Sequence, residues 1–257
     1  MTDPTVIVSH DGPLTTVTIN RPERRNAVDH ETALRLRDAF REFDADEASS
    51  VAILCGRGTT FCAGFDLKSL AAGAFDYEPE GDGPMGPTRM LVSKPVIAAI
   101  EGFAVAGGLE LALWCDMRVA SASAVFGVYC RRWGAPLVDG GTVRLPRLIG
   151  QSRAMDMILT GRGVEANEAL AMGLANRVVP EGTAHEAASL LGRELARFPQ
   201  TCLRADRLSC HLQWGAPLED ALRAEGRAGE RSLHEEARRG AARFASGLGR
   251  SGDFEAI

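Results

Sequence analysis

Short apolar runs and helix-period patterns follow one another along the chain. The runs, which predict strands, lie at residues 6–8, 14–19, 51–54, 96–100 and 117–120. His10-Asp11-Gly12-Pro13 separates the first two and is typical of a hairpin turn. Apolar residues between 33 and 43 recur at helical spacing after Asp29, which is expected to cap that helix. A further helix is predicted over 109–114.

The second half of the chain has a different pattern. From Thr142 onward it is helical, apart from one strand-like stretch at 176–179, and from about Thr183 it is wholly helical. Strands that read as buried, alternating with helices, predict an α/β fold with a parallel sheet. We divide the chain into a core, 1–195, and a C-terminal helical region, 196–257, which is expected to pack on a neighbouring subunit or to cover a cleft.

Glycine is frequent, at 28 of 257 residues. Residues 71–88 are rich in Gly and Pro and predict a mobile surface loop of the kind that often covers an active site. Residues 102–108 are expected to form a glycine-containing turn.

Composition narrows the class of protein. With 45% hydrophobic and 25% charged residues the chain is typical of a globular protein, and no apolar run is long enough to span a membrane. The first residues lack the pattern of a signal peptide, so a cytoplasmic location is expected. A net charge of −5 argues against non-specific nucleic-acid binding. The six cysteines show neither C-x-x-C pairs nor metal-ligand spacing, so we expect reduced thiols that fill the core and no metal site.

Two glycine-containing turns, 63–66 and 106–110, follow predicted strands and precede helices. The first N–H groups of a helix have no partner within the helix, and glycine lets a ligand approach them closely. Two such turns facing each other would form an oxyanion hole, which stabilises an anion derived from a carbonyl compound. Either turn alone is also compatible with an ordinary strand-to-helix connection.

The sequence resembles the crotonase (enoyl-CoA hydratase/isomerase) superfamily over nearly its whole length. The motifs that carry the resemblance are Asn20-Arg21-Pro22 with Asn26-Ala27, Phe61 to Lys68, Lys94 to Ile100, Ala106 to Ala112, Cys115-Asp116, Phe126-Gly127, Gly140 to Pro146, Thr160-Gly161-Arg162 and Ala169 to Leu174. The resemblance implies a spiral of β-β-α turns with a helical C-terminal region, assembled as a homotrimer or a dimer of trimers. It also implies an acyl-CoA thioester substrate, with coenzyme A as part of the substrate and no separate cofactor.

Site residues follow from the same motifs. The resemblance implies that the backbone N–H groups of Phe65 and Gly107 form the oxyanion hole. Those implied to contact the substrate or its CoA portion are Arg24, Arg25, Ala27, Ala63, Gly64, Asp66, Leu67, Lys68 and Gly108. For Arg24, Arg25 and Lys68 the alternative is solvated surface charge. Lys68 is one of only two lysines in the chain, the other being Lys94.

Glu110 lies one helical turn after Gly107, on the same face of the predicted helix. There its carboxylate is placed to move a proton at the α- or β-carbon of the thioester, and apolar walls would raise its pKa toward a useful range. The alternative is that a Glu in the first turn only complements the helix dipole.

The chain departs from the family pattern after Phe126-Gly127. Where hydratases of the superfamily carry a second glutamate, this sequence has Cys130, whose thiol is mostly protonated at neutral pH. Asp139 is the nearest replacement carboxylate, the alternative being an N-cap for the helix that starts near Gly140. Tyr129 and Cys130 are further candidates for the second group.

We expect an acyl-CoA enzyme of the enoyl-CoA hydratase/isomerase type, with Glu110 and Asp139 as catalytic residues. Double-bond isomerisation needs only a proton shuttle and therefore suits a single carboxylate. A non-catalytic acyl-CoA-binding protein is the alternative from another class, because the second glutamate is missing. RNA binding is disfavoured by the acidic balance and the scarcity of lysine.

Overall fold

The computed structural model describes residues 3–73 and 77–249. Within these ranges, the larger of two sheets has the strand order β1-β2-β3-β4-β6-β9. Its strands are β1 (Val6–Asp11), β2 (Leu14–Ile19), β3 (Val51–Gly56), β4 (Val96–Ile100), β6 (Met117–Ser121) and β9 (Arg177–Val179). β1 pairs with β2 antiparallel through the predicted hairpin, and the other neighbours are parallel. The prediction of a mostly parallel sheet is confirmed.

The second sheet consists of β5 (Phe103–Val105), β7 (Val125–Gly127) and β8 (Gly163–Glu165). The expectation of a turn throughout 102–108 is therefore wrong, because three of its residues form β5. Strands of three residues are too short to leave a recognisable alternation in the sequence. Along the chain, β4 in the large sheet leads to β5 in the small one and then to α3 (Gly107–Trp114). This is the predicted β-β-α turn.

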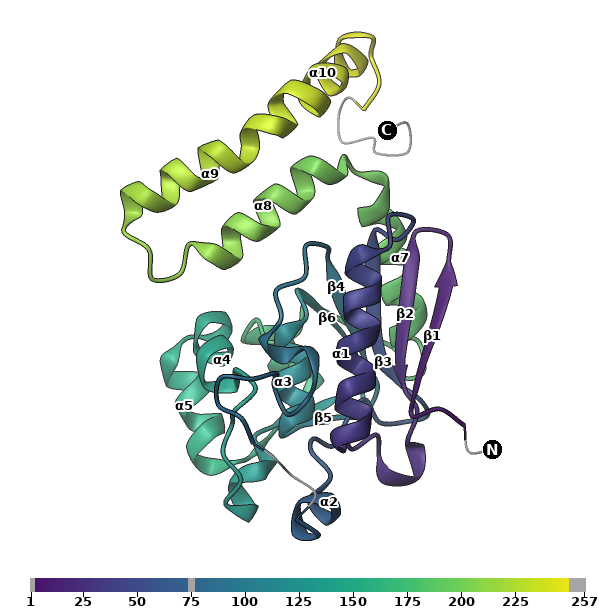
Figure 1. Ribbon diagram of the computed structural model, residues 1–257, viewed down its shortest axis with the longest axis vertical. Coiled ribbons are helices and arrows are strands. Elements are labelled where there is room, and N and C mark those ends of the chain that lie inside the picture. The colour runs from purple at the N-terminus through teal and green to yellow at the C-terminus, as the bar shows by residue number, and fades with distance from the viewer. Residues whose placement is uncertain (1–2, 74–76, 250–257) are drawn as a thin grey trace.

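Helices cover both faces of the large sheet (Figure 1). Along β3, Ala52 and Leu54 face the core under α1 (His30–Ala45) and α3, whereas Val51 and Ile53 face α7 (Ala184–Arg197). A strand buried on both faces has no polar side, which is why β3 appears in the sequence as an unbroken apolar run. Asp29 caps α1 as expected, since its side chain accepts a hydrogen bond from Thr32 N.

The remaining elements of the core connect these layers. They are α2 (Leu67–Ala71), α4 (Gly141–Ile149), α5 (Gln151–Thr160), α6 (Ala166–Ala171) and three 3₁₀ turns, η1 (Pro22–Arg24), η2 (Pro87–Arg89) and η3 (Tyr129–Trp133).

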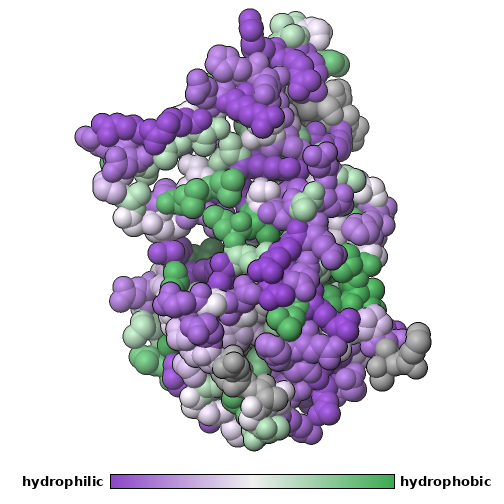
Figure 2. Space-filling model, in the orientation of Figure 1, coloured by the Kyte–Doolittle hydropathy of each residue, from purple (hydrophilic) through white to green (hydrophobic). Residues whose placement is uncertain are grey.

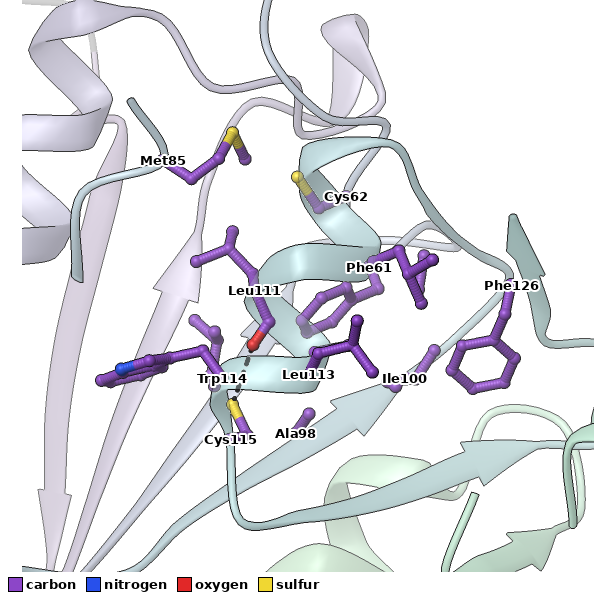
Figure 3. Close-up of a cluster of buried hydrophobic side chains, with 14 of the residues drawn as sticks. Phe61, Cys62, Met85, Ala98, Ile100, Leu111, Leu113, Trp114, Cys115 and Phe126 are labelled. Atoms are coloured by element: carbon purple, nitrogen blue, oxygen red, sulfur yellow. Dashed lines mark hydrogen bonds between the residues drawn. The ribbon is translucent and has the colours of Figure 1, made fainter. Parts of the chain in front are cut away.

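Helix α3 is buried along its whole length. Leu111, Leu113 and Trp114 project from it into the main core, where Phe61 and Phe126 also lie (Figure 3). Close packing on every side fixes the position of the helix, so groups at its first turn are held rigidly.

Beyond α7 the chain forms a helical arm that stands away from the sheets (Figure 1). It contains α8 (Gln200–Leu212), α9 (Leu218–Ser232), a π-helical turn (Leu233–Ala237) and α10 (Arg238–Ala245). The expected division at residue 195 falls in the last turn of α7. None of the helices within the described ranges is long and apolar enough to cross a membrane.

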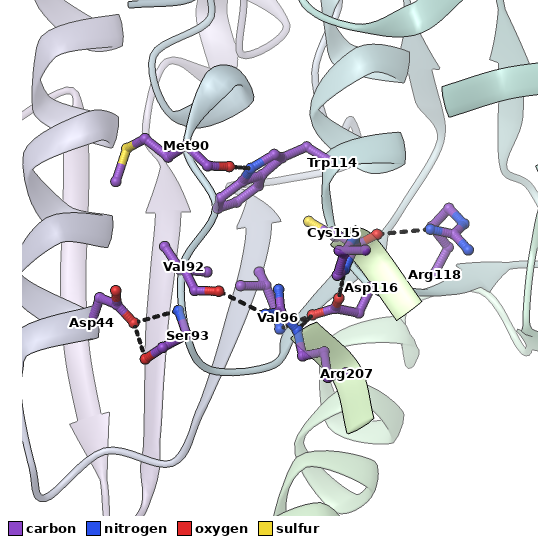
Figure 4. Close-up of polar contacts among 11 residues, drawn as sticks. Asp44, Met90, Val92, Ser93, Val96, Trp114, Cys115, Asp116, Arg118 and Arg207 are labelled. Atoms are coloured by element: carbon purple, nitrogen blue, oxygen red, sulfur yellow. Dashed lines mark hydrogen bonds and ion pairs between the residues drawn. The ribbon is translucent and has the colours of Figure 1, made fainter. Parts of the chain in front are cut away.

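Asp116 joins α8 to the core. Its carboxylate accepts hydrogen bonds from Arg207 Nε at 2.8 Å and from Val96 N at 2.8 Å, and it pairs with His211 Nε2 at 2.9 Å. Arg207 also donates to the carbonyl of Val92 at 2.6 Å (Figure 4). The Cys115-Asp116 motif therefore has a structural role in this chain.

The prediction of a mobile surface loop over 71–88 is wrong for its second half. Gly83, Met85 and Thr88 are buried. A Cβ atom at Gly86 would lie 2.4 Å from the carbonyl oxygen of Ala33, so the glycine allows the loop to pack directly against α1. The Gly-rich composition here reflects close approach. Residues 74–76 of the predicted loop lie outside the described residues.

Candidate active site

The two glycine-containing turns lie side by side. Residue 62 pairs with β5 in parallel fashion, since Cys62 N donates to Phe103 O and Val105 N donates to Cys62 O. A Cβ atom at Gly64, whose φ is +98°, would lie 2.8 Å from the Cβ of Ala106 and 2.9 Å from the nitrogen of Gly107. Only glycine fits this approach, so the predicted juxtaposition of the two turns is present.

Both turns open onto one cavity of about 500 Å³. Phe65 and Gly107 line it, and so do Glu110, Cys130 and Asp139. Gly107 is the first residue of α3, where the backbone N–H has no partner within the helix. Apolar and aromatic residues make up most of the remaining wall: Leu67, Leu70, Tyr77, Met85, Phe103, Val105, Tyr129, Trp133, Ala135, Pro136 and Val138.

Glu110 is held by the loop that leads into α4. Its Oε1 atom accepts hydrogen bonds from Asp139 N at 2.9 Å and from Gly141 N at 2.8 Å. Burial raises the pKa of Glu110 to about 7, and the charge of Asp139 adds to this effect, while the two N–H donors and Arg144 oppose it. The shift has the predicted direction and brings the pKa of this carboxyl close to neutral pH.

Asp139 does not cap the following helix. The N-cap of α4 is Gly140, and no side-chain cap bond is present there. Instead, Asp139 Oδ1 accepts a hydrogen bond from Met85 N at 3.0 Å and another from the hydroxyl of Thr88. The side chain is 2% exposed, and burial raises its pKa despite these donors.

Cys130 and Tyr129 lie on η3 in the cavity wall. Burial raises the pKa of the Cys130 thiol, and the charge of Glu110 raises it further. The thiol is therefore neutral at physiological pH.

The residues expected to contact CoA fall into three groups. Arg25, Ala63 and Leu67 line the cavity. Arg24 and Lys68 are exposed and are not part of its lining.

The remaining residues expected to contact CoA stabilise the two glycine-containing turns or the segments next to them. Asp66 caps α2 by accepting from Lys68 N at 3.0 Å, and it pairs with Arg21 at 3.2 Å. The carbonyl of Ala27 accepts a hydrogen bond from the same Arg21. Gly108 sits where a Cβ atom would lie 2.1 Å from Cys62 O, and Gly64 brings the two turns together. Contacts of all these residues with CoA remain predictions.

Several site residues left no recognisable signal in the sequence. Met85 and Thr88 lie in the segment expected to be a surface loop, yet they bind Asp139. Arg144 donates to the carbonyls of Asp139 at 2.9 Å and Thr88 at 2.7 Å, and so fastens the two loops together. Among the described residues, no group of three or more His, Cys, Asp or Glu side chains is placed to hold a metal ion.

The cavity therefore brings together two glycine-containing turns and a buried carboxyl group within an α/β fold. The chain belongs to the enoyl-CoA hydratase/isomerase family, whose model matches residues 10–248. It is an acyl-CoA-processing enzyme, a hydratase-like lyase of the crotonase superfamily, as predicted.

Related sequences and a solved structure support this family assignment. The chain is 40% identical over 192 residues to the enoyl-CoA hydratase EchA19 of Mycobacterium tuberculosis, covering 70% of each protein. It is 37% identical over 211 residues to the (E)-benzylidenesuccinyl-CoA hydratase of Thauera aromatica, covering 80% of this chain and 82% of the relative. The crystal structure of enoyl-CoA hydratase EchA1 from Mycobacterium marinum superposes with a TM-score of 0.89 at 34% identity, covering 95% of this chain and 96% of that one.

Proposed function

We propose that this enzyme adds water to the double bond of an α,β-unsaturated acyl-CoA, with Glu110 and Asp139 as the two catalytic carboxyl groups. Water oxygen bonds to the β-carbon, the carbon–carbon π bond breaks, and the electron pair moves to the thioester oxygen as an enolate. The N–H groups of Phe65 and Gly107 stabilise that enolate. A proton then reaches the α-carbon, and the thioester is restored.

The positions of the two carboxyl groups in the cavity support this proposal. Glu110 and Asp139 both line the same cavity as the two turns, and the Asp139 backbone N–H holds the Glu110 carboxylate. Asp139 therefore provides a second carboxyl group although Cys130 occupies the position implied for the family glutamate. In this reaction Glu110 takes the proton from water and returns one to the α-carbon, while Asp139 accepts a hydrogen bond from the same water. Only water and the thioester take part, so no further cofactor is needed.

Isomerisation of the double bond is a second candidate. The neutral thiol of Cys130 beside Glu110 favours it, because a thiol holds water less well than a carboxylate. In that reaction Glu110 removes a proton from the α-carbon of a 3-enoyl-CoA and delivers it to the γ-carbon.

The variant Asp139→Asn tests whether the enzyme hydrates or isomerises the double bond. We expect this variant to lower kcat for hydration of crotonyl-CoA about 10–1,000-fold, since the amide no longer accepts as strongly from water. It also removes the charge that raises the pKa of Glu110, so the pH profile shifts to lower pH. Incorporation of ¹⁸O from labelled water, followed by mass spectrometry, measures hydration directly.

The matched control is Glu31→Gln, which neutralises an exposed carboxyl paired with Arg35 on α1. It is expected to leave both reactions unchanged. If Asp139→Asn hydrates crotonyl-CoA at the wild-type rate, Asp139 has no part in the reaction. Turnover of a 3-enoyl-CoA alone, without ¹⁸O uptake, identifies an isomerase instead.

The predicted homotrimer, or dimer of trimers, is also proposed here. Within the described residues, the helical arm exposes several large apolar side chains: Leu212, Leu218, Leu222 and Leu233. In the space-filling view, apolar residues gather in the hollow between the arm and the core (Figure 2). Exposed patches of this kind mark association surfaces, and further copies of the chain are the occupants we expect. Multi-angle light scattering distinguishes three or six chains from one.

A further inference from the structure

One guanidinium, that of Arg89, joins two parts of the cavity wall. Its Nη1 atom donates to the carbonyls of Glu78 at 3.1 Å, Pro79 at 2.8 Å and Gly81 at 2.8 Å. Its Nη2 atom donates to the hydroxyl of Tyr77 at 3.2 Å and to the carbonyl of Val138 at 3.2 Å. The 77–81 segment is thereby attached to the residue that precedes Asp139.

The Val138 carbonyl belongs to the same peptide group as the N–H of Asp139. That N–H donates to Glu110 Oε1 at 2.9 Å. A hydrogen bond on the carbonyl end of a peptide orients the group and strengthens the donor at its other end. Arg89 therefore acts on Glu110 through one peptide, and its charge also opposes the rise in the pKa of Asp139 that burial causes.

At its other end, this hydrogen-bond network reaches Tyr77 in the wall of the cavity, where we expect the acyl group to bind. Tyr77, which Arg89 binds through the hydroxyl and approaches within 5.7 Å of the ring centroid, lines the cavity. Val138, whose carbonyl accepts from the same Nη2 atom as the Tyr77 hydroxyl, lines it too. An acyl chain that packs against Tyr77 thus presses on a segment whose position is linked to the Val138–Asp139 peptide.

We infer that Arg89 is a positioning residue that couples the seating of the 77–81 segment to the alignment of Glu110. This role rests on the proposed function, in which Glu110 moves the proton. A planar guanidinium suits the task because its several N–H groups bind carbonyls on both sides at once, whereas an ammonium acts as a point charge.

Other charged or titratable groups also face Glu110. They are Asp139, Arg144 and Cys130, and all three are retained in the Arg89 variants. Arg37 provides the control, because it pairs with Asp82, the residue that follows Gly81, at 2.9 Å, whereas the bond to Val138 comes from Arg89.

The experiment compares Arg89→Gln, Arg89→Lys and Arg37→Gln. The Glu110 carboxyl is titrated by ¹³C NMR, assigned by its disappearance in Glu110→Gln, and the pH profile of kcat is measured with crotonyl-CoA. Both Arg89 variants are expected to raise the pKa of Glu110 by about 0.5–1 unit, because its N–H donor weakens. They should also lower kcat about 10-fold, with a smaller change in KM. Arg37→Gln is expected to change KM alone.

Two outcomes overturn the inference. If both Arg89 variants fold and bind CoA but titrate as wild type, Arg89 merely anchors a loop. If Arg89→Lys retains the wild-type titration, charge suffices and positioning is not involved. The NMR arm needs no turnover, so a shifted Glu110 in an enzyme that hydrates no enoyl-CoA supports the coupling while refuting the proposed function.

Discussion

Glu110→Gln is expected to lower kcat for enoyl-CoA hydration about 10²–10⁴-fold, the usual contribution of a positioned general acid/base. The amide oxygen still accepts from the N–H groups of Asp139 and Gly141, which Glu110 Oε1 binds at 2.9 and 2.8 Å, so the loop keeps its position. The ability to exchange a proton near pH 7 is lost. Steady-state kinetics with crotonyl-CoA, together with calorimetry on a non-reactive acyl-CoA, separates turnover from binding.

The pH dependence of this variant gives an independent test. Because the pKa of Glu110 is raised to about 7, the ionised form that takes a proton from water accumulates above that pH, and wild-type kcat/KM should rise through it. The contribution of Glu110 to the stability of the fold changes with pH in the opposite direction. The contribution of the protonated carboxyl is fully present below the unfolded pKa and is lost as pH rises through about 7.

Glu110→Gln has no such titration. The melting temperature of the variant relative to wild type is therefore expected to increase between pH 5 and pH 8. A constant difference across that range, or wild-type turnover by the variant, would remove Glu110 from the proposed mechanism.

The sequence predicts the large sheet better than the small one. β3 and β4 are unbroken apolar runs because both faces are covered, by α1 and α3 on one side and by α7 on the other. β5, β7 and β8 each contribute three residues, and their pairing is set by contacts across long stretches of chain. Periodicity reports burial, so it cannot identify strands that are too short for a period.

The residues of the site likewise divide into those that the sequence predicts and those that it does not. Glu110, Phe65 and Gly107 are identifiable because each lies in a local motif, a glycine-containing turn that precedes a helix. Thr88, Arg89 and Arg144 act through carbonyls and carboxylates roughly fifty residues away, and no local pattern encodes that distance. For Asp139, the local sequence and the tertiary contacts point to different roles. Its proximity to a helix start suggested a cap, whereas its tertiary contacts with Met85 and Thr88 hold it in the cavity wall.

Arginine in place of lysine now has a structural reason. Arg118, which is 2% exposed, donates to the carbonyls of Leu174 at 2.6 Å and Cys115 at 2.9 Å. Arg144 and Arg89 likewise bind carbonyls on more than one segment. A rigid fork of donors serves this purpose better than a single ammonium. Several arginines here therefore hold loops together, whatever part others have in binding CoA.

The oxyanion hole is tested by Gly107→Pro. Proline at the first position of a helix removes an N–H that has no helical partner. It also disfavours the backbone conformation of Ala106, which precedes it with φ 55° and ψ −125°, so a crystal structure of the variant must show that the turn and α3 keep their positions. If the Gly107 N–H stabilises the enolate, kcat should fall about 10²–10³-fold, the usual loss for one oxyanion donor. The measurement is kcat for crotonyl-CoA, with thermal unfolding to verify the fold.

Gly107→Ala separates loss of the donor from crowding. A Cβ atom at this position would lie 2.5 Å from Met85 Sδ, the end of a flexible side chain that can move aside. Both variants carry this Cβ, but alanine keeps the N–H, whereas proline replaces its hydrogen with the ring carbon Cδ. We therefore expect Gly107→Ala to retain most of the activity that Gly107→Pro loses. Equal losses in the two would mean that displacement of Met85, which also holds Asp139 through its own N–H at 3.0 Å, accounts for the effect, and that the Gly107 amide does not bind the oxyanion.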